Sequence, residues 1–177
     1  MNKYMKMAYC EALKNPLSPF ESRKGGPFGV ALVGEDGEVF VTRNEVKETN
    51  DPTMHAEIVA IRKASEKRGM AYLKTCVIYC TCYPCPMCLG AIHWAGIKKV
   101  FYGCRPTDVR TMNLSAEDLS RLDDVPAYSL ILRQAIDFEI EAEKEKSIWF
   151  DEIDRDECLT LYTEWSERAK PAKKTEV

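Results

Sequence analysis

Two short motifs that must meet at one point constrain the fold more than any other feature of the sequence. They are TMHAE at residues 53–57 and PCPMC at residues 84–88. Cys85 and Cys88 stand three residues apart at a predicted helix start, so that both sulfurs lie on one helix face and can bind one metal ion. His55 offers a third ligand of a kind that zinc prefers. The motifs therefore predict a fold in which two helix starts face each other across a Zn²⁺ ion.

Glu57 follows the predicted histidine ligand by two residues and is left over once the metal ligands are assigned. A zinc ion with three protein ligands keeps its fourth position for water and lowers the pKa of that water to roughly 7. Such a site needs a group that carries protons, and a carboxyl suits that role. The run DPT at residues 51–53 reads as a cap with proline at the first helical position, so a helix is predicted over residues 53–68. This start places His55 in the first turn and lets Glu57 fold back beside the metal.

The spacing of the two cysteines also occurs in structural zinc sites and in redox pairs, and a redox pair lacks its usual sequence context here. A structural site needs a fourth ligand, which Cys82 could supply, but the position of Glu57 would then be a coincidence. A lone histidine is more often a core residue, yet the cap position of His55 and the glutamate after it favour a ligand. The predicted metal ligands are therefore His55, Cys85 and Cys88. Glu57 is the predicted catalytic residue.

Length and charge limit the classes of protein to which the chain can belong. Its 177 residues suit one domain, predicted over residues 1–170, with a disordered tail at residues 171–177. A net charge of −3 disfavours nucleic acid as the partner, because gripping a phosphate backbone requires clustered positive charge. No apolar run is long enough for a membrane span, and the N-terminus lacks the apolar centre of a signal peptide. A cytoplasmic protein with a small-molecule substrate is expected.

The eight cysteines are not distributed like a disulfide framework. Those from Cys76 to Cys88 crowd into one short stretch, where a strand and a helix leave little freedom for disulfide geometry. Reduced thiols and a metal site are therefore expected. Cys10, Cys104 and Cys158 lie among apolar residues and are predicted to be small core side chains.

Hydrophobic periodicity predicts alternating helices and strands. A helix is predicted over residues 2–14, and its apolar residues at helical spacing are Tyr4, Met7, Ala8, Cys10 and Leu13. Strands are predicted at residues 30–33, 39–42, 75–81, 100–102 and 147–153, the first two as a hairpin, and a last helix at residues 154–169. This alternation predicts an α/β protein with a three-layer α/β/α fold and a central mixed sheet of about five strands.

The two motifs resemble the signature of the cytidine-deaminase superfamily of zinc-dependent nucleobase deaminases, H-x-E followed by P-C-x-x-C. Within that superfamily the chain is most similar to bacterial guanine deaminases. The likeness rests on GGPFG at residues 25–29, Asn44, NDPTMHAE at residues 50–57 and CPMCLGAIHWA at residues 85–95. It covers roughly the first 105 residues and returns more weakly from Ser147 to Trp165. It implies a cytidine-deaminase-like fold, a bound Zn²⁺ and hydrolytic deamination of a free aminopurine, with guanine first and its nucleoside second.

The resemblance also implies which residues contact the substrate. Phe28 and Trp94 would stack on the flat base, and the amide of Asn44 would match a base edge with one donor and one acceptor. The backbone N–H of Ala56 would face the carbonyl oxygen of the base. An acidic residue after the fourth strand would hold the purine, and Glu117 is the first candidate and Asp118 the second.

The chain departs from the family pattern at three places, one of which is the run at residues 112–118, where guanine deaminases have their acidic residue after Gly-Phe. Tyr83 stands where the family usually has a glutamate, and the chain ends in Thr-Glu-Val where family members often end in Pro-Tyr. These departures leave the substrate open between guanine, a pyrimidine such as cytosine, and the adenosine of a tRNA. A non-catalytic, zinc-stabilised binding module is a further alternative, which the intact Glu57 disfavours. The resemblance implies a homodimer that pairs through helices beside the zinc site and exchanges its C-terminal segments.

Overall fold

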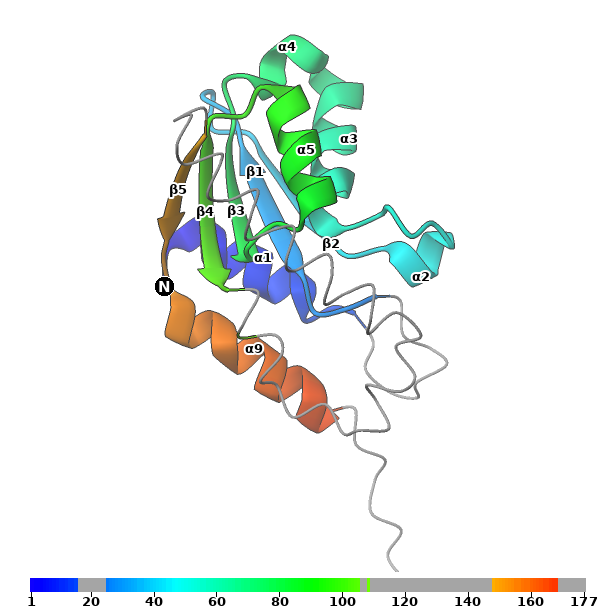
Figure 1. The fold of residues 1–177 in the computed structure, drawn as a ribbon, viewed down its shortest axis with the longest axis vertical. Coiled ribbons are helices and arrows are strands. Elements are labelled where there is room, and N and C mark those ends of the chain that lie inside the picture. The colour runs from blue at the N-terminus through cyan, green and yellow to red at the C-terminus, as the bar shows by residue number, and fades with distance from the viewer. Residues whose placement is uncertain (16–24, 106–107, 109–147, 169–177) are drawn as a thin grey trace, which may run out of the picture.

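The computed structural model describes residues 1–15, 25–105, 108 and 148–168, and it has a central sheet with helices on both faces (Figure 1). The helices are α1 (Lys3–Ala12), α2 (Val46–Thr49), α3 (Ala56–Arg68), α4 (Met70–Leu73), α5 (Pro86–Ala95) and α9 (Arg155–Arg168). The strands are β1 (Gly29–Val33), β2 (Val39–Arg43), β3 (Val77–Cys82), β4 (Lys99–Cys104) and β5 (Trp149–Glu152). The predicted three-layer α/β/α fold is confirmed.

The five strands form one mixed sheet in the order β2-β1-β3-β4-β5. The predicted hairpin is confirmed, because β1 and β2 pair antiparallel and Val33 lies opposite Val39 across a short turn. β1 also pairs antiparallel with β3, whereas β3, β4 and β5 run parallel. Parallel neighbours need a crossover, and α5 provides it between β3 and β4. This crossover places the PCPMC motif at the end of β3, where the chain leaves the sheet.

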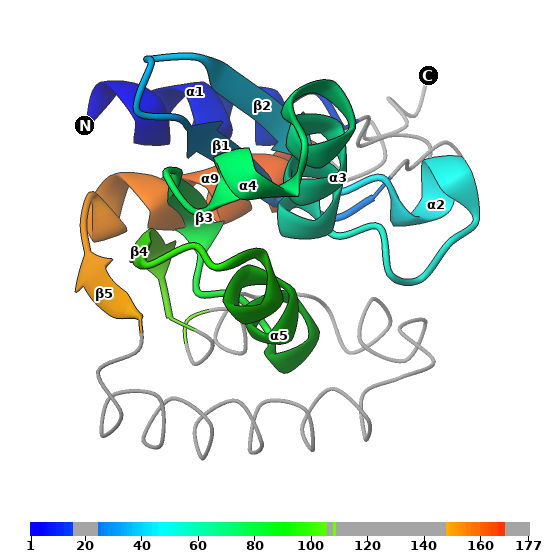
Figure 2. The ribbon, with the colours of Figure 1, turned by 90° about the horizontal axis from the view of Figure 1, so that it is seen from above.

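Each face of the sheet has its own apolar cluster. α3 and α5 pack together on one face, where Ala60 and Ile92 meet the sheet residues Leu32, Ile78 and Val100. On the other face α1 packs against β1, β2 and β3, and α9 packs against β4 (Figure 2). Side chains from α1 and α9 share a second cluster that contains Met5, Cys104, Cys158 and Tyr162. The two helix starts with the metal-binding motifs therefore lie on the same side of the sheet.

The buried face of α1 differs from the predicted one. Met7 is 41% exposed and Cys10 is also exposed, whereas Met5, Ala8 and Ala12 are fully buried. The reason is a close approach to β1, since a Cβ at Gly29 would lie 2.0 Å from the Ala8 carbonyl oxygen. Only small side chains fit that contact, and periodicity alone does not reveal it. The prediction that Cys10 is a core residue was wrong.

Cys104 and Cys158 are fully buried, as predicted. Three other predictions lie outside the described residues: Glu117, Asp118 and the tail at 171–177. Among the helices that the structure describes, none is both long enough and apolar enough to cross a membrane.

Candidate metal and catalytic site

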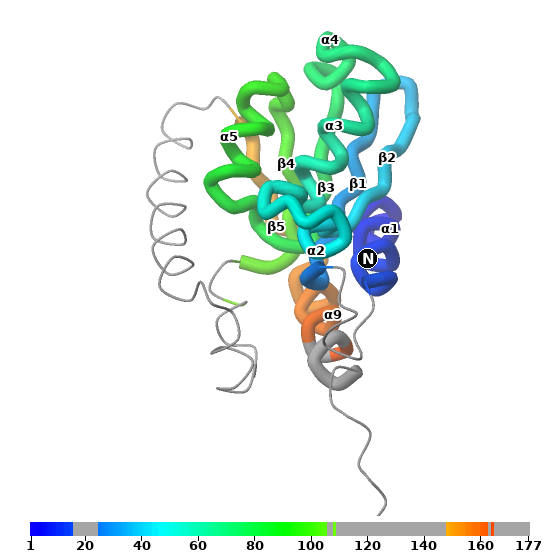
Figure 3. The backbone as a smooth tube through the Cα atoms, turned by 90° about the vertical axis from the view of Figure 1, so that its right-hand side faces the viewer, coloured from blue at the N-terminus to red at the C-terminus, as the bar shows by residue number. Residues whose placement is uncertain are grey.

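Three metal-binding side chains meet where α3 and α5 begin. His55 is the N-cap of α3, Cys85 is the N-cap of α5, and Cys88 lies in the first turn of α5. The His55 Nδ1 atom lies 3.6 Å from the sulfur of Cys85 and 3.6 Å from that of Cys88, and the two sulfurs are 3.6 Å apart. α3 and α5 run next to each other, which brings both caps to one place (Figure 3). The structure thus brings together the three residues that the sequence indicated.

The dimensions of this triangle fit one zinc ion. Tetrahedral Zn–S bonds of about 2.3 Å and a Zn–N bond of about 2.0 Å place two sulfurs about 3.8 Å apart, and a nitrogen and a sulfur about 3.5 Å apart. The three observed separations of 3.6 Å fall between these values. Two sulfurs with one imidazole are ligands that zinc favours, and three protein ligands leave one position open.

α3 starts three residues later than predicted. The Asp51 carboxylate accepts hydrogen bonds from the backbone N–H and the hydroxyl of Thr53, at 2.8 and 2.7 Å. These bonds hold residues 51–53 in a turn, and His55 remains extended, with φ −65° and ψ 157°. The first helical residue is therefore Ala56, and His55 is the cap rather than part of the first turn. Residues two apart inside a helix do not lie on the same face. Because α3 starts after His55, the side chains of His55 and Glu57 can still approach the same point over the end of the helix.

Glu57 is only 8% exposed and lies beside the three metal-binding side chains. Its carboxyl is hydrogen-bonded to the side chain of Cys88 and to its own backbone N–H. Burial raises the pKa of Glu57, the negative charge of Cys85 raises it further, and the charge of His55 lowers it in part. A buried carboxyl in this position, beside the three metal-binding side chains, can serve as a proton carrier.

The two thiols are strongly coupled. The hydrogen bond between Cys85 and Cys88 lowers the pKa of Cys85 to about 4, with help from the hydrogen bond to His55. The same bond and burial both raise the pKa of Cys88. Burial alone would lower the pKa of His55, but its hydrogen bond to Cys85 and the charge of Glu57 raise it overall. A zinc ion bound between these side chains would hold both sulfurs as thiolates.

Cys82 does not join this group. Among the residues that the structure describes, the donors close enough to share a metal ion are those of His55, Cys85 and Cys88. Cys82 packs instead against the cluster around Cys158 and Tyr162, where burial raises the pKa of Cys82 to about 12. The structural-zinc alternative, which needs Cys82 as a fourth ligand, therefore lacks support in the described part of the chain.

The structure places Phe28 and Asn44 next to each other at the ends of two paired strands. Phe28 is half-buried just before β1, and Asn44 follows β2 and is 6% exposed. The backbone N–H of Asn44 donates to the Phe28 carbonyl at 3.0 Å. The Phe28 ring meets Tyr162 of α9 edge-on at 5.8 Å. Sequence reasoning missed this contact of Tyr162 with a candidate base-stacking ring.

One buried hydroxyl group positions Ala56. The Thr42 hydroxyl donates to the Ala56 carbonyl at 2.7 Å and joins β2 to the start of α3. The first intrahelical bond of α3 runs from the Val59 N–H to the His55 carbonyl, so the backbone N–H of Ala56 points out of the open helix end. Open N–H groups at a helix start favour a partly negative oxygen. Sequence reasoning missed Thr42, which reads as an ordinary strand residue.

Trp94 and Tyr83 have opposite surroundings, the first in solvent and the second in the core. Trp94 is 87% exposed on α5, so the described part of this chain does not enclose its ring in a pocket. Tyr83 is 5% exposed and packs against Tyr102 and Phe150, with ring centroids 4.9 and 5.3 Å away. The Tyr83 side chain, which stands where the family usually has a glutamate, thus fills the core between the end of β3 and the edge strand β5.

Comparison with known proteins gives the family. The cytidine and deoxycytidylate deaminase zinc-binding region matches residues 1–104. A guanine deaminase of Bacillus subtilis (strain 168) is 44% identical over 103 residues, which are 58% of this chain and 66% of that protein. A tRNA-specific adenosine deaminase of Agrobacterium fabrum is 37% identical over 94 residues, which are 50% of this chain and 62% of that protein. Each match thus spans less than two thirds of the relative's length.

A solved structure covers more of the chain. The X-ray structure of guanine deaminase from Bacillus subtilis is similar with a TM-score of 0.56 and 33% identity, over 99% of each chain. The region matched by the family contains His55, Cys85 and Cys88, so the metal of this site is Zn²⁺. The chain therefore belongs to the family of deaminases that share the cytidine and deoxycytidylate deaminase zinc-binding region.

Proposed function

We propose that the chain catalyses the hydrolytic deamination of a free aminopurine base, guanine before its nucleoside, with water as co-substrate and xanthine and ammonia as products of guanine. The observation that carries this proposal is the buried Glu57 carboxyl, with a raised pKa, beside three zinc-binding side chains that leave one position open. A structural zinc site has no use for such a carboxyl. The similarity to guanine deaminase of Bacillus subtilis supports guanine as the base.

His55, Cys85 and Cys88 hold the zinc, which supplies an activated water when bound. Glu57 would accept one proton from the attacking water, whose oxygen bonds to the amino-bearing carbon, and deliver it to the ring nitrogen of the base. The same carboxyl would then carry the second proton of that water to the amino group, whose bond to carbon breaks so that it leaves as ammonia. Burial raises the pKa of Glu57, which favours its role as a group that binds a proton and passes it on. The Ala56 N–H donates to the carbonyl oxygen of the base.

Phe28 and Asn44 hold the base in this proposal. The half-buried ring of Phe28 stacks on the purine, a contact that contributes about 1 to 3 kcal/mol. The Asn44 side-chain oxygen accepts a hydrogen bond from the Val46 N–H at 3.2 Å, which fixes the orientation of the amide. Its NH₂ group is then the end that can donate to the base.

The direct test is ammonia release by the zinc-loaded chain from guanine, guanosine, adenine, cytosine and a tRNA with a wobble adenosine. We expect guanine to give the highest kcat/KM and guanosine a lower one. A higher kcat/KM for cytosine or for the tRNA would show that guanine is not the preferred substrate, while hydrolytic deamination would remain the reaction. No ammonia from any substrate would contradict the proposed function and favour a non-catalytic zinc-binding module.

Discrimination for guanine should depend on an acid in residues 114–118, which lie outside the described residues. Guanine presents its N1–H and 2-amino group as adjacent donors, so a selective pocket needs a carboxylate acceptor. Loss of such an acceptor costs about 2 to 4 kcal/mol of transition-state binding, a fall of tens to several hundredfold in kcat/KM. We expect this fall for Glu117→Gln with guanine and no matching fall with cytosine, and Asp118→Asn tests the second candidate in the same way. If each variant lowered kcat/KM by the same factor for guanine and for cytosine, neither acidic residue would be the one that selects guanine.

The homodimer implied by the resemblance is part of the proposal. Met87 and Trp94, both on α5 beside the zinc site, are 37% and 87% exposed, and burial in a second copy would account for such side chains. Exchange of C-terminal segments between the copies belongs to the same proposal. Sedimentation at micromolar concentration should give twice the chain mass, and a fully active monomer would contradict it.

A cytoplasmic location is also proposed. All eight cysteines are free thiols, which fits a reducing compartment. Cell fractionation should recover the chain with the cytoplasmic proteins, and recovery with a membrane or secreted fraction would overturn the assignment.

A further inference from the structure

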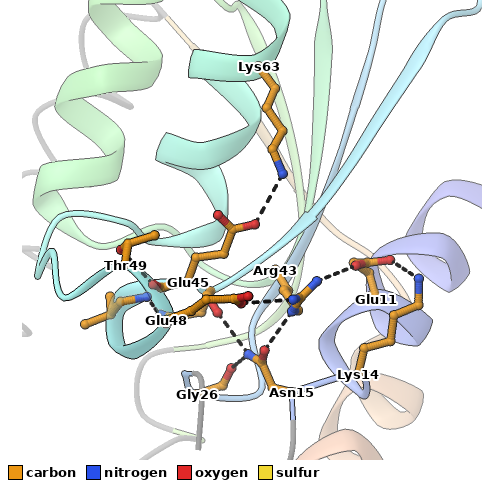
Figure 4. A network of polar contacts seen from close by, with 11 residues as sticks. Glu11, Lys14, Asn15, Gly26, Arg43, Glu45, Glu48, Thr49 and Lys63 are labelled. Atoms are coloured by element: carbon orange, nitrogen blue, oxygen red, sulfur yellow. Dashed lines mark hydrogen bonds and ion pairs between the residues drawn. The ribbon is translucent and has the colours of Figure 1, made fainter.

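Asn15 lies just beyond α1 and its side chain is completely buried. A buried amide has to find hydrogen-bond partners, because an unsatisfied one is costly. Among the described residues its side chain has three such partners, and none of them belongs to α1. Its Nδ2 atom donates to the Gly26 carbonyl at 2.7 Å and to the Asn44 carbonyl at 3.0 Å, and its Oδ1 atom accepts from Arg43 Nε at 2.9 Å (Figure 4).

The partners fix the orientation of the Asn15 amide. A guanidinium can only donate, so it requires the amide oxygen, and two carbonyl groups can only accept, so they require the NH₂ end. Arg43 is itself held on both sides, by Glu11 at 3.1 Å and Glu48 at 3.0 Å (Figure 4). Flipping the amide would therefore break three hydrogen bonds at once, and the side chain has one stable orientation.

The carbonyl groups that Asn15 holds belong to the segments that carry the two base-contact residues. The Phe28 N–H donates to the same Gly26 carbonyl at 2.9 Å, and the Asn44 N–H donates to the Phe28 carbonyl at 3.0 Å. Together with the two bonds from Asn15, these form a closed circuit from Gly26 through Phe28 and Asn44 back to Asn15. The packing inside it is tight, since a Cβ at Gly25 would lie 2.3 Å from Asn44 Oδ1.

We infer that Asn15 is a positioning residue for base recognition, which fixes the separation of Phe28 and Asn44 through the carbonyl groups of Gly26 and Asn44. The inference rests on the proposed function, in which these two residues hold the base. Asn15 itself acts through the backbone of its partners. Its loss should therefore weaken binding of the base equally in the ground state and in the transition state, which raises KM and leaves kcat nearly unchanged.

Two variants separate positioning from stability. Asn15→Ala removes all three hydrogen bonds, whereas Asn15→Asp keeps an oxygen for Arg43 and loses only the donor to the two carbonyl groups. We expect both to raise KM for guanine about tenfold or more and to change kcat by less than about threefold, with an unchanged zinc content. Hydrogen exchange of the backbone amides of Phe28 and Asn44 in the free protein should become at least about tenfold faster, because the ring of hydrogen bonds that holds them is broken.

Leu73→Ala is the matched control for lost stability, because Leu73 is buried in the cluster between the sheet and α3 and lies outside the circuit. Partial unfolding lowers the amount of active protein and hence the apparent kcat, so this control should leave KM unchanged. A double-mutant cycle adds a second criterion: Asn15→Asp should raise KM less in an Asn44→Ala background than in wild type.

The outcomes are distinguishable. An unchanged KM in Asn15→Asp, with an active wild type, overturns the inference and leaves the proposed function standing. The same holds if Asn15→Asp lowers kcat with KM unchanged, as Leu73→Ala is expected to do. A wild type that releases ammonia from no base overturns the proposed function, and the inference falls with it. Asn15→Asp decides the question even where Asn15→Ala does not fold.

Discussion

Glu57→Gln should lower kcat by about two to four powers of ten and leave the zinc content and the melting temperature close to those of wild type. Glutamine has the size of glutamate and can keep a hydrogen bond to Cys88, but it cannot take up and release a proton. Positioned proton transfer contributes about 10²- to 10⁴-fold to rate. Stability should hold because Glu57 is almost fully buried and its raised pKa means that ionising it in the folded state is already costly. Steady-state ammonia release and metal analysis of the same preparation measure both quantities.

Glu45→Gln is the control for this prediction. Glu45 is also an acid near the start of α3, but its carboxylate pairs with Lys63 at 3.2 Å on the surface. Removing a surface pair changes stability by at most about 1 kcal/mol, and turnover should remain near that of wild type. If Glu57→Gln keeps more than about a tenth of wild-type turnover while Glu45→Gln is normal, another group carries the protons.

Cys85→Ala should abolish activity and reduce bound zinc to a small fraction of one ion per chain. Removing one of three protein ligands leaves two, and binding by two ligands is too weak to survive purification. Because metal binding is coupled to folding, the melting temperature should fall as well, and added zinc should not restore it. Metal analysis and thermal unfolding, each with and without added zinc, give the measurement.

Cys82→Ala provides the contrast, because Cys82 lies three residues before Cys85 and packs in the other cluster. We expect this variant to lose some stability through a small cavity and to keep about one zinc per chain and its activity. Equal zinc loss in Cys82→Ala and Cys85→Ala would make Cys82 a ligand. That result would favour a closed structural site over a catalytic one.

The metal site was predictable because its determinants are local. Pro86 at the first helical position and Gly96 in the left-handed conformation bound α5, and Gly69, with a φ of 79° and an extended ψ of 162°, ends α3. Each of these signals lies within a few residues of the feature that it controls. The start of α3 was predicted three residues early, because the Asp51 side chain closes a turn that resembles a helix cap in sequence.

The features that the sequence did not predict depend on contacts between distant parts of the chain. The buried face of α1 is set by the lack of a side chain at Gly29, and Cys10 therefore lies in solvent although it fits an apolar periodicity. Asn15 has its partners at Gly26, Arg43 and Asn44, and in the sequence it reads only as a helix end before a proline. The sequence motif places Trp94 on the helix that carries Cys88. The motif does not indicate which face of that helix packs against the rest of the protein.

The central claim is an open zinc site with three protein ligands, and X-ray absorption at the zinc edge of the purified chain tests it most directly. The geometry of His55, Cys85 and Cys88 leads us to expect two sulfur ligands at about 2.3 Å and two nitrogen or oxygen ligands at about 2.0 Å, one of them exchangeable solvent. The Cys82→Ala variant should give the same spectrum as wild type. A third sulfur ligand in wild type, lost in Cys82→Ala, would show a closed structural site and contradict the account.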